Sequence, residues 1–122
     1  LKDRLAALSI HTMEQLYDRV LTPQRRAVLG GELSASGEDV LMLAKLADVS
    51  RLRYVNPAFA TLLAHSAYDT AALIRKADPQ ALHQEIVAVN GKYGFFKGRI
   101  NPKDMEFLIR EAENVSLDIR YD

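Results

Sequence analysis

Apolar residues recur at helical spacing through most of the chain, and a polar residue able to cap a helix precedes each run. After Ser36, for example, Val40, Leu43, Ala44 and Ala47 fall on one face of a helix. Seven segments begin in this way, behind Thr12, Thr22, Ser36, Asn56, Thr70, Asp78 and Asn101. All four prolines directly follow one of these capping residues, in the first turn, where their missing N–H costs no hydrogen bond. The pattern predicts an all-α chain of about seven short helices.

The same periodicity assigns apolar residues to the inward faces of these helices. Three pairs of neighbours are expected to point into the core: Val28 with Leu29, Leu73 with Ile74, and Ile86 with Val87.

The last residues of the sequence show a different pattern of apolar positions. Val115, Leu117, Ile119 and Tyr121 alternate with polar residues, which is typical of a strand with one apolar face. The other extended candidate, residues 51–55, is short and reads equally well as a connector. We therefore expect a short C-terminal strand or extended tail, residues 116–122, that docks on its own domain or adds to a second chain.

Size and charge restrict the classes of function. The chain has 122 residues, which suits a single domain, and its 16 basic residues balance 16 acidic ones. No overall field therefore draws it to nucleic acid or to an acidic membrane, so any electrostatic site must be local. The absence of cysteine and of a membrane-length apolar run leads us to expect a cytoplasmic protein with no membrane association.

The two halves of the chain have apolar and helix-capping residues at matching positions. An offset of 58 places Leu5 on Leu63, Thr12 on Thr70 and Leu29 on Val87, and an offset of 65 then places Ser36 on Asn101. The second half therefore carries seven extra residues, within residues 91–98. We expect pseudo-repeats at about residues 1–49 and 50–115.

The stretch from Leu52 to Thr70 resembles a helix-hairpin-helix motif. The positions that fit it are Val55, Ala60, Leu62, Leu63, Tyr68 and Thr70. With its flanking helices, the whole chain is similar to the bacterial family known as domain of unknown function 4332, which consists of tandem degenerate helix-hairpin-helix repeats. The resemblance implies two helix-hairpin-helix-like (SAM-like) units in tandem.

Intact hairpins of this kind hold a DNA phosphate against backbone amides at the start of their second helix. Here Tyr54 and Asn56 stand at the two hairpin glycine positions, and Ser66-Ala67 replaces a later Ala-Gly. Pro57 removes one amide donor as well. Phosphate binding at this hairpin should be weakened, and Asn56 can serve simply as a helix cap.

The extra segment of the second half is the one local basic patch. Lys92, Lys97, Arg99 and Lys103 alternate there with Tyr93, Phe95 and Phe96, and no acidic residue interrupts residues 91–99. Cations that meet phosphates beside rings that stack on bases suit a nucleic-acid backbone. In the other reading, the phenylalanines fill a gap between helices while the lysines stay in solvent.

We assign candidate nucleic-acid contacts to these four basic residues, with Arg53 and Asn56 of the hairpin. Gly91 to Gly94 matches the G-x-x-G of a KH domain, but the sheet that accompanies that loop is not predicted.

No pattern indicates catalysis or a cofactor. His11, His65 and His83 lie on different segments without metal-ligand spacing, and Glu111 and Glu113 do not share a helix face. We expect a non-catalytic module without metal or cofactor. Two functions stay open: weak, sequence-independent binding of a DNA or RNA backbone, and a protein-interaction or scaffold module, with self-association through the tail as one form.

Overall fold

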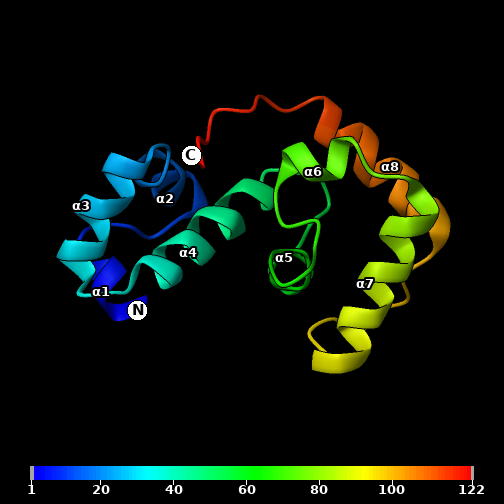
Figure 1. Ribbon diagram of the computed structural model, residues 1–122. Coiled ribbons are helices and arrows are strands. Elements are labelled where there is room, and N and C mark those ends of the chain that lie inside the picture. The colour runs from blue at the N-terminus through cyan, green and yellow to red at the C-terminus, as the bar shows by residue number, and fades with distance from the viewer. Residues whose placement is uncertain (1, 122) are drawn as a thin grey trace. The chain divides into compact units, whose positions relative to one another are not determined.

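The computed structural model describes residues 2–121, and the regular secondary structure in this range is helical (Figure 1). Eight helices lie within this range: α1 (Lys2–Ala7), α2 (Met13–Arg19), α3 (Pro23–Leu33), α4 (Gly37–Val49), α5 (Pro57–Ala64), α6 (Ala71–Arg75), α7 (Pro79–Tyr93) and α8 (Pro102–Glu113). The all-α prediction is confirmed. The extra helix is α1, which has six residues, none of them buried.

The capping residues begin the helices as expected. The side chains of Thr12, Thr22, Asn56, Thr70 and Asp78 each accept a hydrogen bond from the backbone N–H three residues later. Such a bond satisfies one of the four amides that a helix start leaves open, so these short helices have defined first turns.

The contacts divide the chain into two compact units. Unit 1 joins the chain up to Asp48 with the tail from Asp118 onward, and unit 2 is Val49–Leu117. Each unit contains four helices in the same order, with Thr12 and Thr70 as caps at matching positions. Superposition of the two halves stays a prediction.

Unit 1 has its own apolar core. It is formed by Ile10, Leu16, Val20, Leu29, Leu33, Val40, Ala44, Ala47 and Ile119. The last of these comes from the tail, so unit 1 is completed by residues far away in the sequence.

The tail docks without forming a strand. Within residues 2–121 there is no strand, and the tail bonds through its backbone to the connection between α2 and α3, from Arg120 N to Leu21 O at 2.8 Å. The expected apolar face is present except at one residue. Val115, Ile119 and Tyr121 are at least partly buried and the polar residues between them are exposed, but Leu117 is 47% exposed. Side-chain bonds hold the tail instead: Tyr17 donates to Asp118 at 2.9 Å, and Tyr121 donates to Asp48 at 2.7 Å.

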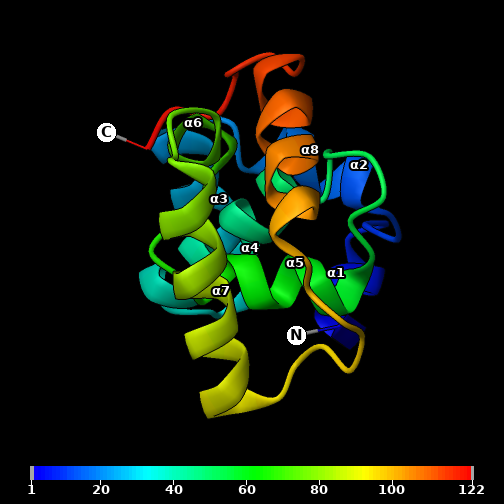
Figure 2. The same cartoon turned by 90° about the vertical axis from the view of Figure 1, so that its right-hand side faces the viewer.

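Unit 2 is built around α8, which packs against both α6 and α7. The two views show α8 running back beside α7 after a loop that includes residues 94–101 (Figures 1 and 2). The buried face of α8 consists of Met105, Leu108, Ile109 and Ala112. This pairing fixes the start of α8 beside the loop and the hairpin before α5.

Three of the residues expected to point inward do not. Val28 is 62% exposed, Leu73 46% and Val87 45%, while their neighbours Leu29, Ile74 and Ile86 are fully buried. Adjacent residues on a helix lie about 100° apart, so a narrow contact can bury only one of each pair.

A candidate binding groove on unit 2

The connection between α4 and α5, residues 50–56, is called the hairpin here and contains one residue in the left-handed conformation. Tyr54 has φ of 66°, a conformation that glycine adopts without strain and that tyrosine adopts at a cost. Asn56 has an extended backbone, and its Oδ1 accepts the Phe59 N–H at 2.8 Å. Tyrosine thus takes the backbone conformation suited to glycine, and Asn56 is a helix cap, as the sequence suggested.

The Tyr54 side chain projects from this hairpin. It is 82% exposed, and its ring centroid lies 5.6 Å from that of Phe107 on α8. The guanidinium carbon of Arg53 lies 5.6 Å from the Tyr54 ring. The hairpin therefore presents an aromatic ring and a cation side by side.

The loop after α7 is pinned to unit 2. The Asn90 side chain bonds the backbone of Phe96 twice, donating to its carbonyl at 2.8 Å and accepting from its N–H at 2.9 Å. The Phe96 ring meets Phe59 edge to face at 5.2 Å. Gly98 lies against this ring, because a Cβ at position 98 would come within 2.7 Å of the Phe96 ring edge and the ring would have to move. Phe96 therefore fills a gap between the loop and α5, as the second interpretation of the sequence expected.

The first part of the extra segment is helical. Helix α7 continues to Tyr93 and ends at Gly94, whose φ is 69°. Gly91 therefore lies inside a helix and does not belong to a G-x-x-G loop. Tyr93 and Phe95 stack at 5.1 Å, and the His65 ring lies 4.7 Å from that of Phe95.

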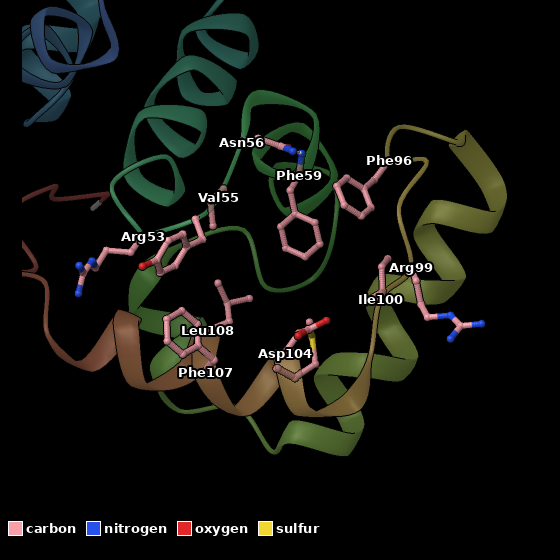
Figure 3. A pocket seen from close by; sticks show the side chains of 12 residues that line it. Arg53, Val55, Asn56, Phe59, Phe96, Arg99, Ile100, Asp104, Phe107 and Leu108 are labelled. Carbon is pink, nitrogen blue, oxygen red and sulfur yellow. Dashed lines mark hydrogen bonds between the residues drawn. The ribbon is translucent and has the colours of Figure 1, made fainter.

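A groove opens between the hairpin, the start of α8 and the pinned loop (Figure 3). Its volume is about 220 Å³. Aromatic rings come from all sides: Tyr54 from the hairpin, Phe59 from α5, Phe96 from the loop and Phe107 from α8.

The charged residues of the groove lie at its ends and at the start of α8. In Figure 3, Arg53 and Arg99 stand at opposite ends, with their guanidinium groups directed outward. Asp104 lies between them, and its Oδ2 accepts the Asn101 N–H at 3.0 Å, which fixes the first turn of α8. Arg53 Nε is 3.8 Å from Glu111 Oε1 while its side chain stays 73% exposed, so this ion pair leaves the guanidinium open to solvent.

The structure brings together three of the six residues assigned to nucleic-acid binding. Arg53, Asn56 and Arg99 line the groove. Lys103 lines a separate depression together with His83. Lys92 and Lys97 are exposed, and Lys92 Nζ lies 5.1 Å from the Tyr93 ring.

Sequence reasoning missed Phe59, Asp104 and Phe107 as parts of this site. Phe107 carried a signal, because it is a large apolar residue on the polar side of α8, next to the inward Leu108, and it is 40% exposed. No sequence pattern indicated that Phe59 and Phe96 would lie close together, since their contact depends on how the loop after α7 folds back.

Two of the three histidines make contacts that link parts of unit 2. His83 Nε2 lies 2.9 Å from the Ile100 carbonyl and ties α7 to the loop, and the His65 ring packs at a tilt against the rings of Tyr93 and Phe95. Over residues 2–121, no three His, Cys, Asp or Glu side chains gather as metal ligands would.

In the same range, no helix combines the length and the apolar character that crossing a membrane requires. Compared with known proteins, the chain has no significant match among curated proteins or among solved structures. A family model does match, over residues 1–115, and its description is "Domain of unknown function (DUF4332)". The match covers nearly all of the chain and includes every groove residue, so the protein belongs to this family.

Proposed function

We propose that the chain is a non-catalytic binding module of the helix-hairpin-helix type, which binds the backbone of nucleic acid weakly and without sequence preference. The observation that carries the proposal is the placement of Arg53 and Arg99 at the two ends of one aromatic groove. Exposed cations beside exposed rings are the combination that single-stranded nucleic acid requires.

The charge distribution favours unit 2 as the binding unit. Val49–Leu117 contains nine Lys and Arg residues against seven Asp and Glu residues, whereas the rest of the chain has an acidic excess. The basic excess is small, so the affinity should be low and should depend on salt.

A module for protein interaction is the second candidate, and the groove itself favours it. Tyr54 and Phe107 are large apolar residues in mutual contact that remain 82% and 40% exposed. Aromatic residues around a pocket are common anchors of protein partners. The cations at both ends lead us to rank nucleic acid first.

Titration of labelled single-stranded and double-stranded DNA at several salt concentrations, followed by fluorescence anisotropy, tests the proposal. Binding should weaken as salt rises, with similar affinity for unrelated sequences. Arg99→Ala should reduce the slope of log K against log salt by about 0.7 on single strands, the value for one lost phosphate contact.

Arg110→Ala is the matched control, because Arg110 is exposed on α8 and does not line the groove. It should leave the slope unchanged. Equal effects of the two variants, or binding that salt does not weaken, would contradict the proposal.

A further inference from the structure

The groove on unit 2 has features that binding of a phosphate backbone does not need. Four aromatic rings line it, and a carboxylate, that of Asp104, lies on the α8 side of the groove between Arg53 and Arg99 (Figure 3). A phosphate placed there would be repelled by this carboxylate. The charges of the groove therefore direct phosphates to its ends and something uncharged to its middle.

The size of the groove limits the occupant. Its volume of about 220 Å³ lies below the roughly 300–1,000 Å³ of sites for drug-sized ligands. A dinucleotide cofactor is too large for it, whereas a single ring system is of suitable size.

The arrangement of the rings favours a flat aromatic occupant. Phe59 and Phe96 form one edge-to-face pair at 5.2 Å, and Tyr54 and Phe107 form a second, tilted pair at 5.6 Å. Such rings offer faces and edges to a base, and stacking of this kind works for every base because each has a π face.

The polar groups of the groove can meet the edge of a base. Asp104 uses one oxygen to cap α8, but a carboxylate has about four acceptor sites, so it can still accept from an exocyclic amino group. Asn56 uses its Oδ1 to cap α5, and its amide nitrogen carries two further donors.

We propose that this groove binds one unpaired base of single-stranded nucleic acid, with the two flanking phosphates at Arg53 and Arg99. The inference rests on the proposed function and adds to it the part of the ligand that enters the groove. A phenylalanine of an acidic peptide would also match the rings, but cations at both ends and a carboxylate between them fit a base flanked by phosphates better.

The test compares two strands of equal length, twelve deoxycytidines and twelve abasic sites with the same phosphate backbone. Anisotropy titrations of wild type should give an affinity about tenfold higher for the strand with bases, as expected for one stacked base. Phe107→Ala should abolish this difference and leave the affinity for the abasic strand unchanged.

Val87→Ala is the matched control, because Val87 is about as exposed as Phe107 but does not line the groove. It should keep the tenfold difference, and circular dichroism of both variants should show intact helices. Tyr54→Ala provides a second variant for the groove, and it should also remove the preference for the strand with bases.

Each contrary result has a distinct meaning. Equal binding of the two strands by wild type would overturn the base-binding groove and leave backbone binding intact. Failure of both strands to bind at low salt would overturn the proposed function as well. Binding of an acidic phenylalanine peptide that depends on Phe107, with no binding of either strand, would assign the groove to a protein partner and overturn the inference.

Discussion

Tyr121 donates its hydroxyl hydrogen to the carboxylate of Asp48 at 2.7 Å, across 73 residues of sequence. Asp48 is only 3% exposed, and the guanidinium of Arg26 lies over the Tyr121 ring at 5.6 Å. The end of the described tail is therefore fixed in unit 1 by a hydrogen bond to a buried acid and by a cation over its ring.

Tyr121→Phe should lower the free energy of unfolding by about 2 kcal/mol, because it removes a hydrogen bond to a charged, buried group. Urea unfolding monitored by circular dichroism measures the change. Tyr54→Phe is the control, since Tyr54 is 82% exposed, and it should unfold like wild type. An unchanged midpoint for Tyr121→Phe would show that the bond adds nothing to stability.

Removal of the tail after Leu117 should lower the melting temperature and leave the mass in solution unchanged. The reason is that Ile119 fills part of the core of unit 1, and loss of such a side chain costs about 2–5 kcal/mol. Light scattering coupled to gel filtration reports the mass. A dimer that dissociates on truncation would instead support self-association through the tail.

Gly98→Ala should destabilise the chain by about 0.5–1.5 kcal/mol, because its new Cβ would lie 2.7 Å from the outer edge of the partly buried Phe96 ring and must turn it out of its rotamer. Gly91→Ala is the matched control. Position 91 lies inside α7 with no atom near the new Cβ, so alanine should stabilise the helix by about 0.5–1 kcal/mol. Thermal unfolding of both variants would reveal opposite signs, and equal shifts would contradict the packing of the loop.

At position 54, glycine should be more favourable than alanine by about 1 kcal/mol, because the backbone there is left-handed with φ of 66°. Comparison of Tyr54→Gly with Tyr54→Ala isolates the backbone effect, since both variants lose the ring. At Val28, which is exposed inside α3, the same pair should show the reverse order. If urea unfolding showed alanine to be more favourable than glycine at both positions, the backbone of residue 54 would not be left-handed.

Leu29→Ala should cost about 2–5 kcal/mol, whereas Val28→Ala should change stability by less than about 0.5 kcal/mol. The two residues are neighbours on α3, but Leu29 is fully buried and Val28 is 62% exposed. Similar urea midpoints for the two variants would show that α3 is rotated relative to this structure.

The helix starts could be predicted from the sequence because each depends on a few adjacent residues. Thr12, Asn56 and Asp78 are polar residues in front of apolar runs, and each makes its capping bond within three residues. Helix α1 escaped prediction because it has no buried residue to set a period.

The tail and the groove depend on contacts between distant residues, and periodicity carries no information about these. An alternating pattern predicted that Leu117 and Ile119 would share a buried face, yet Ile119 enters the core of unit 1 while Leu117 is 47% exposed, because burial depends on which side chains meet that core. The groove likewise exists because Asn90 anchors Phe96 beside Phe59, on the far side of a loop.

The chain order of the two units has a consequence for folding during synthesis. Unit 2 is continuous, from Val49 to Leu117, so its residues have all left the ribosome before the tail does. Unit 1 is completed only when Ile119 and Tyr121 have been synthesised. To reach residues such as Asp48, they must close a loop that contains the whole of unit 2. Unit 2, with its groove, can therefore reach its native packing first, while nascent unit 1 still has part of its apolar core exposed to solvent.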